Sequence, residues 1–464
     1  MKKISLTLND LFNIPTAEIF NPDNFKPVSK VFIDSRNVVK NSLFVAIKGE
    51  KLDGHKFVEE AINKGASVVI INKKNIKEFS GLEIPFVTVK DTTEALGNLA
   101  RVWRKKIRTK VIGISGSNGK TSTKEMLASL LSQKYSVNKT IANNNNHIGV
   151  PLTILSTNEK HDVLVAEIGT NHFGETKYSA SIAQPDYALI TNIGDSHLEF
   201  LKNRKGVLEE KSALFEEAAN AGGTVVVNYD DKLLKDFSKR FKNQISYSLK
   251  NSQADVKGTI TVYTNDGRPI VNVEFKKQKM NFKLPVHGEN SAKNFISAAA
   301  IGLTLGLTKN QIADGLKKVK PVDKRLHVKS YKNFSLIDDT YNANPESMKT
   351  AFNLLAKIKT FRNKTAILGD MFELGKDSAM FHKNLADEII KNKISSVFTI
   401  GSSMKNLYTA LKNKNIETKH FANRETLKLF LSEKDFPNTV VLVKGSRGMK
   451  MEEFVQVIET KAND

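Results

Sequence analysis

The stretch "VIGISGSNGKTSTKEML", residues 111–127, decides the fold in the middle of this 464-residue chain. It begins as an apolar strand, breaks at glycines around a Gly-Lys-Thr triplet, and continues as a helix with one apolar face. Backbone N–H groups at such a turn, at the start of a helix, are free to surround a phosphate. The pattern therefore predicts a nucleotide-binding loop made of Gly116, Ser117, Asn118, Gly119, Lys120, Thr121 and Ser122.

Two side chains of this loop have roles that follow from their chemistry. Lys120 brings a positive charge to the β- and γ-phosphates of ATP, and the hydroxyl of Thr121 can bind Mg²⁺. The common phosphate-loop pattern has a glycine where this chain has Ile114. The departure leaves the strand, loop and helix order intact, so nucleotide binding remains the prediction.

Further apolar strands follow the loop, in "HDVLVAEIG", "DYALITNIG" and "GTVVVNYDD". Strands that are apolar throughout and separated by helical stretches are typical of a parallel sheet covered on both faces. In such sheets ligands bind at the carboxyl ends of the strands. Glu167 and His197 each follow one of these strands, so we expect both at the sheet edge that carries the phosphate loop, with Glu167 as a candidate Mg²⁺ ligand.

Short β-branched runs alternate with helical patterns along most of the chain, which is typical of an α/β fold. The sequence predicts three domains: a small α/β N-terminal domain (1–108), a central P-loop ATPase domain with a parallel sheet (109–320) and a Rossmann-like C-terminal domain (321–464). The polar stretch 251–286, with an Asp-Gly turn, indicates an antiparallel excursion. The charged stretch 104–110 indicates a hinge.

Composition excludes several classes of protein. The chain has no cysteine, which rules out disulfides and thiolate chemistry and is typical of a reducing cytoplasm. Its net charge of +22 favours anionic partners, but the lysines are spread along the chain without a basic, aromatic-rich stripe, so we expect no nucleic-acid partner. No apolar run approaches the ~20 residues that span a bilayer, and no signal peptide begins the chain. We therefore expect a cytoplasmic protein without membrane insertion.

Five motifs together resemble the Mur ligase family of peptidoglycan synthesis, over about 34–448. In chain order they are "SGSNGKTSTKEML", "NNNNHIGVPLTIL", "EIGTNHFGE", "NIGDSHLEFL" and "DDTYNANPESM". The resemblance implies a ligase that uses ATP to phosphorylate a peptide carboxylate, so that an amine can attack the acyl phosphate. The last motif favours UDP-N-acetylmuramoyl-tripeptide as the acid and D-alanyl-D-alanine as the amine.

The resemblance also implies a catalytic set, comprising Lys120, Glu167, His197 and Lys211. Two Mg²⁺ ions are implied, one held by Thr121 and Glu167 and a second by His197. Lys211 matches a lysine that the family modifies with CO₂ to a metal-directed carbamate. Ser212 and Ala213 follow it, where the family has a small and an acidic residue.

Other residues match substrate-binding positions of the family. Asn294 matches a residue near the adenine or ribose, Arg325 an arginine that closes onto the ATP phosphates, and Asp339 a carboxylate near the ribose. The family's usual His-Asn pair is replaced here by Asn290 and Ser291, which leaves the adenine contacts open. The positions implied for the other substrates are Ser35, Arg36, Asn145, Asn146, Tyr341, Asn342 and Asn344.

Four alternatives stand beside this interpretation. The ligase that adds the third amino acid typically carries an Asp-Asn-Pro-Arg motif, which this chain lacks, and folate polyglutamate synthesis lacks the N-terminal "DSR" module found here. A nucleic-acid-dependent P-loop ATPase needs a strand ending in an acidic pair and an arginine-finger element. We find neither feature in the expected order along this sequence. A catalytically inactive binding protein is the fourth. We expect the active protein to be a monomer.

Overall fold

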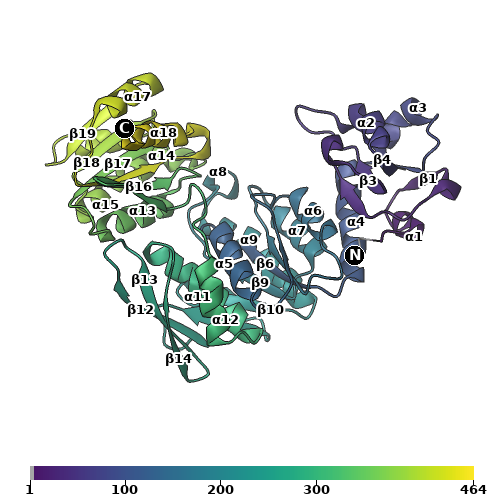
Figure 1. Ribbon diagram of the computed structural model, residues 1–464, viewed down its shortest axis with the longest axis horizontal. Coiled ribbons are helices and arrows are strands. Elements are labelled where there is room, and N and C mark those ends of the chain that lie inside the picture. Colours follow the sequence, from purple (N-terminus) through teal and green to yellow (C-terminus); the bar gives the residue numbers. More distant parts are fainter. Residues whose placement is uncertain (1–4, 464) are drawn as a thin grey trace.

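The computed structural model describes residues 5–463, whose strands form sheets of five, nine and six strands (Figure 1). The N-terminal sheet, the central sheet and the C-terminal sheet lie in a row, in chain order. Each is a mixed sheet with helices against it, which confirms the predicted three-domain α/β fold. The boundaries proposed from the sequence, 108/109 and 320/321, stay predictions. No helix within residues 5–463 is both long and apolar enough to cross a membrane.

The N-terminal sheet has the strand order β1-β5-β4-β3-β2, and only β1 runs antiparallel to its neighbour. The central strands are buried on both faces, which explains their continuous apolar sequence. The strands are β1 (Glu18–Phe20), β2 (Lys30–Phe32), β3 (Ser42–Val45), β4 (Ala66–Asn72) and β5 (Phe86–Val89), and the helices α1 (Leu8–Phe12), α2 (Val58–Asn63) and α3 (Ile76–Phe79).

Helix α4 (Thr92–Lys106) joins the first two domains and packs against the central domain. Its C-terminal Arg104 donates to Ala183 O and Gln184 O, each at 2.9 Å, and pairs with Asp186 at 2.9 Å. These carbonyls lie at the C-terminal end of helix α7 (Glu175–Ala183), where they accept no hydrogen bond within the helix. The guanidinium provides their donors. The charged stretch expected to act as a hinge is therefore anchored at Arg104.

The central sheet has the order β14-β13-β12-β11-β10-β9-β6-β8-β7. The strands from β6 to β12 run parallel, whereas β12, β13 and β14 form antiparallel hairpins, so the predicted antiparallel excursion is confirmed. The strands are β6 (Lys110–Ser115), β7 (Val137–Lys139), β8 (Val163–Glu167), β9 (Tyr187–Ile190), β10 (Thr224–Asn228), β11 (Gln244–Ser248), β12 (Val256–Tyr263), β13 (Pro269–Phe275) and β14 (Gln278–Lys283).

Alternate residues of the parallel strands face two separate cores. One core contains α4, α6, α7 and α9, and the other contains α5, α11 and α12, so helices cover both faces of the sheet. The helices are α5 (Lys120–Leu131), α6 (Gly149–Leu155), α7 (Glu175–Ala183), α8 (Leu198–Leu201), α9 (Arg204–Asn220), α10 (Lys232–Ser238), α11 (Gly288–Thr304) and α12 (Lys309–Lys318).

The C-terminal sheet has the order β15-β16-β20-β17-β18-β19, parallel except for β15. This is the Rossmann-like arrangement predicted from the sequence. The strands are β15 (His327–Ser330), β16 (Phe334–Asp339), β17 (Asn363–Gly369), β18 (Ser396–Ile400), β19 (Glu417–Phe421) and β20 (Thr439–Lys444), and the helices α13 (Pro345–Lys357), α14 (Ser378–Lys383), α15 (Leu385–Lys391), α16 (Lys405–Leu411), α17 (Arg424–Glu433) and α18 (Glu452–Asn463).

Candidate active site

The phosphate loop connects β6 to α5 and depends on two glycines in the left-handed region. Gly116 has φ +136° and Gly119 has φ +85°, values that other residues adopt only with strain. A β-carbon at Gly116 would overlap the hydroxyl of Thr191, and one at Gly119 would lie 2.5 Å from Asn294 Oδ1. The loop is therefore closely packed, with Asn294 of α11 beside it, whereas the implied contact of Asn294 with adenine or ribose stays a prediction.

The loop does not offer all its backbone N–H groups to a phosphate. The N–H of Ser117 donates to Asn192 O at 3.0 Å, and that of Asn118 donates to Asn192 Oδ1 at 3.1 Å. The N–H groups of Lys120, Thr121 and Ser122, in the first turn of α5, have no acceptor within the helix and no side-chain cap. A phosphate would therefore be held mainly by the helix N-terminus, with Ser117 and Asn118 fixing the loop against the strand end of β9.

Lys120 lies in a partly desolvated position, and its Nζ donates to Gly116 O at 2.7 Å. The pKa of Lys120 is lowered to about 8, chiefly by desolvation; the Glu167 carboxylate opposes this shift and the Arg325 guanidinium adds to it. The group is still largely charged at neutral pH. The charge of Arg325 is thus one of the influences on Lys120.

Glu167 ends β8 and is buried beside Thr121. Its Oε1 accepts from Thr121 Oγ1 at 3.1 Å and from Asn145 Nδ2 at 2.8 Å. Its Oε2 is buried without a hydrogen bond, and the Lys124 ammonium lies 3.4 Å away. An unsatisfied carboxylate oxygen beside a hydroxyl matches the oxygen ligands that Mg²⁺ prefers. These residues therefore fit a magnesium ion.

The donor set is small, as is usual for magnesium. Residues 5–463 contain no group of three or more histidine or acidic side chains that could hold a metal alone. Mg²⁺ commonly uses one or two carboxylates and takes its other ligands from phosphates and water. Thr121 and Glu167 would thus act together with the nucleotide.

Lys124 is a residue of this site that the sequence reasoning missed. Its side chain is 0% exposed, and its Nζ donates to Ala142 O at 2.9 Å. A signal was present, because Lys124 lies at helical spacing with the apolar Leu127 and Leu131 and therefore on the buried face of α5. A charged residue on such a face needs a buried partner, which Glu167 provides.

His197 lies at the predicted edge of the sheet but contacts another domain. It adopts a left-handed conformation with φ +53° at the start of α8. Its Nδ1 lies 2.6 Å from Oε2 of Glu373 in the C-terminal domain, and this hydrogen bond lowers the pKa of Glu373. Within residues 5–463 His197 makes no hydrogen bond or ion pair to Thr121 or Glu167, so a metal-binding role remains a prediction.

Lys211 is enclosed by helix α9 and its surroundings, with only 1% of the residue exposed. The pKa of Lys211 is lowered to about 7, chiefly by burial and then by the charge of Lys120, whereas the carboxylates of Glu210 and Glu175 act in the opposite direction. An amine that is substantially neutral at pH 7 is the form that reacts with CO₂, so the environment of Lys211 fits the implied carbamate.

The C-terminal domain touches the phosphate loop directly, through the first turn of α13. Asn344, which caps this helix, donates from Nδ2 to Asn118 Oδ1 at 3.0 Å. Asn118 Nδ2 in turn donates to Glu346 Oε2 at 3.3 Å. Burial raises the pKa of Glu346. Asn118 thus links the loop to the C-terminal domain.

Three predicted residues gather at the carboxyl ends of β16 and β20. The guanidinium of Arg325 lies 3.7 Å from the ring centre of Tyr341, and that of Arg447 lies 5.3 Å from it. The buried Asp339 accepts from Lys444 Nζ at 2.5 Å and from a backbone N–H at 3.0 Å. Both oxygens of Asp339 are therefore engaged, while Arg325 and Arg447 make no ion pair within residues 5–463.

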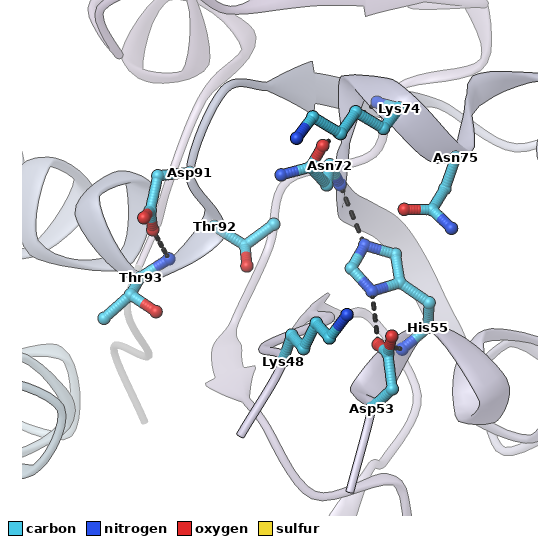
Figure 2. A pocket seen from close by; sticks show the side chains of 9 residues that line it. All are labelled: Lys48, Asp53, His55, Asn72, Lys74, Asn75, Asp91, Thr92 and Thr93. Atoms are coloured by element: carbon cyan, nitrogen blue, oxygen red, sulfur yellow. Dashed lines mark hydrogen bonds and ion pairs between the residues drawn. The ribbon is translucent and has the colours of Figure 1, made fainter. Parts of the chain in front are cut away.

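The N-terminal domain holds a separate pocket of about 450 Å³ (Figure 2). Its wall includes His55, whose Nδ1 contacts Asp53 at 2.6 Å and whose Nε2 accepts from the Asn72 N–H at 2.9 Å. The predicted Ser35 and Arg36 are not among its lining residues. Ser35 is buried and donates to Glu60 at 2.8 Å, whereas Arg36 is exposed and pairs with Asp34.

The asparagine-rich loop, residues 142–146, contains two of the predicted residues, Asn145 and Asn146, which make different contacts. Asn145 reaches Glu167, as described above, and its backbone carbonyl accepts from Gly169 N at 2.8 Å. Asn146 Oδ1 instead accepts from Gly149 N at 2.9 Å and stabilises the start of α6. Asn145 is therefore the residue of this loop that contacts the Glu167 carboxylate.

Three family models match the chain in sequence order. The model described as Mur ligase family, catalytic domain, matches residues 27–104, the Mur ligase middle domain matches 114–302, and the Mur ligase, glutamate ligase domain, matches 324–447. The chain belongs to the Mur ligase family.

Individual Mur ligases resemble the chain over nearly its whole length. The UDP-N-acetylmuramoyl-tripeptide–D-alanyl-D-alanine ligases of Haemophilus influenzae and Bacillus subtilis are each 32% identical, covering 99% and 98% of both chains respectively. A crystal structure of MurF from Acinetobacter baumannii has a TM-score of 0.87 at 28% identity, with 99% of each chain covered. MurF from Thermotoga maritima in complex with ADP has a TM-score of 0.82 at 28% identity, covering 94% of this chain and 98% of its own.

Proposed function

We propose that this Mur ligase joins D-alanyl-D-alanine to UDP-N-acetylmuramoyl-tripeptide and splits ATP to ADP and phosphate. The observation that carries the proposal is the meeting of Lys120, Thr121 and Glu167 where β6 and β8 end, in a chain of which 99% aligns with a UDP-N-acetylmuramoyl-tripeptide–D-alanyl-D-alanine ligase. The ADP complex of the Thermotoga maritima relative supports ATP as the nucleotide.

The reaction begins with a carboxylate, which is a poor electrophile because oxide is a poor leaving group. A carboxylate oxygen of the tripeptide attacks the γ-phosphorus of ATP, and ADP departs. The amine of D-alanyl-D-alanine then attacks the carbonyl carbon of the acyl phosphate, phosphate departs, and the amine gives up a proton. The products are an amide, ADP and phosphate, so all atoms are accounted for.

The main barrier to the first step is repulsion between two anions. It amounts to roughly 4 kcal/mol per pair of unit charges at 4 Å in an effective dielectric of 20. Lys120 would bind the phosphates, and Arg325 would add positive charge from the C-terminal domain. Mg²⁺, with Thr121 and Glu167 as protein ligands, would supply further neutralisation when bound.

Two finer parts of the proposal concern His197 and Lys211. We propose that Lys211 carries a carbamate, since its pKa of about 7 leaves the amine available to CO₂. The carbamate anion, together with His197, would serve a second Mg²⁺ ion. His197 would have to leave Glu373, with which it is now paired across the domain boundary.

The assembly and the location of the enzyme are also proposals. We propose that the enzyme is a monomer, and light scattering coupled to size exclusion tests this. A cytoplasmic location is supported by the need for ATP and a UDP-linked substrate. Detection of the protein in fractionated cells tests it.

The test of the proposed function is ADP release by the purified protein with each substrate supplied separately and together. Full turnover should require both UDP-N-acetylmuramoyl-tripeptide and D-alanyl-D-alanine. Turnover with the dipeptide-linked acceptor and a free amino acid would favour the ligase that adds the third residue. One such ligase shares only 16% identity with this chain, at a TM-score of 0.55, which indicates the fold alone. Stimulation by DNA or RNA alone would contradict the proposal.

A further inference from the structure

Lys124 is a buried lysine whose surroundings consist of oxygen atoms. It lies on α5, one turn after Thr121, and its side chain has no exposed surface. Its Nζ lies 2.9 Å from Ala142 O, 3.3 Å from Glu125 Oε1 and 3.4 Å from Glu167 Oε2. Lysine is almost never fully buried unless it is paired, so these contacts explain its position.

The ammonium of Lys124 is the counter-charge of Glu167. The Oε2 atom of Glu167 has no hydrogen bond, and Lys124 is the cation within ion-pair distance of it. Oε1 accepts from Thr121 and Asn145, which are neutral. The carboxylate that would bind Mg²⁺ is therefore already neutralised when no metal is present.

The same ammonium also fixes the asparagine-rich loop. Lys124 holds this loop through Ala142 O, and Asn145 of the loop donates to Glu167. The lysine, the loop and the carboxylate thus form one closed set of contacts. A change at Lys124 would act on the metal ligand both through charge and through the loop.

The charged groups around this position have a positive sum. Lys139 pairs with Glu125 near the surface, which leaves Lys120 and Lys124 facing Glu167, two positive charges against one negative charge. A free divalent cation is repelled by such a cluster, whereas the anionic complex of Mg²⁺ with ATP is attracted. The arrangement favours entry of the metal with its nucleotide.

We propose that Lys124 is a positioning residue, an internal counter-ion that holds Glu167 in place and excludes free Mg²⁺ until the nucleotide brings the metal. This inference rests on the proposed role of Glu167 as a magnesium ligand. It makes Lys124 a determinant of binding order in the ligase reaction. Lys124 would act through its contacts with Glu167 and Ala142 O.

The test measures binding of Mn²⁺, as a probe for Mg²⁺, to the nucleotide-free protein by electron paramagnetic resonance at pH 8. Lys124→Met removes the charge next to Glu167, and the affinity for Mn²⁺ should rise about tenfold or more. Lys139→Met is the matched control. Its ammonium pairs with Glu125 and is 42% exposed, so water screens it and the affinity should change by no more than about twofold.

Thermal melting would show whether Lys124→Met is folded. Two further measurements keep the proposal testable if it is not. Lys124→Gln retains a donor for Ala142 O and should also bind Mn²⁺ more tightly. The wild-type protein should bind Mn²⁺ at least about tenfold more weakly without ADP than with it. A loss of packing alone would not tighten metal binding in either variant.

The inference is overturned if folded Lys124→Met or Lys124→Gln binds Mn²⁺ no more tightly than the wild type does. It is equally overturned if the wild type binds Mn²⁺ with the same affinity in the presence and absence of ADP. These readouts need no peptide substrate. A failure here is therefore separate from a failure of the proposed ligase reaction, which is measured as product formed.

Discussion

The carboxylate of Glu346, in the C-terminal domain, occupies the space that a β-carbon at Gly194 of the central domain would need. Gly194 follows β9, and its carbonyl accepts from the hydroxyl of Ser117 in the phosphate loop. The absence of a side chain at one position therefore lets a helix of one domain approach the nucleotide site of another. The ATP loop and the C-terminal domain are in contact through this glycine.

Gly194→Ala should weaken this docking, because the new methyl group overlaps Glu346 Oε2. We expect a fall of about tenfold in kcat/KM, the size of a lost interaction of about 1.4 kcal/mol. Gly81→Ala is the control, since a β-carbon there meets no atom within 4 Å. Glu346→Ala should restore part of the loss in the double variant. Wild-type kinetics for Gly194→Ala would show that the contact is irrelevant to turnover.

Lys120→Ala should lower product formation by about 10²-fold or more, because it removes a preorganised positive charge at the phosphates. The melting temperature should stay close to that of the wild type, since Lys120 makes one hydrogen bond, to Gly116 O. Lys134→Ala, at an exposed position near the end of α5, is the comparison. Retention of most activity by Lys120→Ala would remove the phosphate role.

Lys211→Ala should lose most activity and regain part of it with short carboxylic acids in the buffer, which replace the carbamate. Lys205→Ala, an exposed lysine on the same helix, should behave like the wild type. Full activity of Lys211→Ala without added acid would show that the carbamate is misplaced.

The carbamate also predicts a pH dependence. Burial lowers the pKa of Lys211 to about 7, so the neutral amine predominates above that pH and the ammonium below it. Only the neutral amine reacts with CO₂. Activity at limiting CO₂ should therefore rise as the pH passes upward through 7, and saturating bicarbonate should shift the rise to lower pH. An activity independent of CO₂ at all pH values would contradict this.

Lys444→Met should destabilise the C-terminal domain by about 3–5 kcal/mol, because it leaves the buried Asp339 without its counter-charge. Lys434→Met, which breaks a pair with the exposed Glu417, should cost only about 0–1 kcal/mol. Urea unfolding measures both. Equal losses of unfolding free energy for the two substitutions would mean that burial of the Lys444–Asp339 pair does not raise the cost of removing its lysine.

Much of the fold could be predicted from local patterns. Apolar runs such as 163–166 are buried on both faces, and the Gly-Lys-Thr turn follows a strand, so the parallel sheet and the phosphate loop follow from short segments. Asn344 caps α13, and an asparagine directly before a proline is a local signal for such a helix start. These features depend on backbone geometry within a few residues.

Contacts between segments far apart in the chain could not be predicted as well from the sequence. The sequence placed Glu167 by the strand it ends, but not the pairing of His197 with Glu373, which lies 176 residues away. It suggested a nucleotide role for Asp339, whose oxygens are engaged by Lys444 and a backbone N–H. The sequence did not indicate that Lys124 is buried, because a lysine on a helix is usually solvated. Such pairings depend on how domains and loops meet, which periodicity does not encode.

The most direct test of the central claim, that ATP activates a carboxylate at this sheet edge, is trapping with hydroxylamine in place of D-alanyl-D-alanine. We expect the tripeptide hydroxamate to form together with ADP, in equal amounts and only when UDP-N-acetylmuramoyl-tripeptide is present. ADP released at full rate without the tripeptide, or ADP formed with it but without any hydroxamate, would contradict the account.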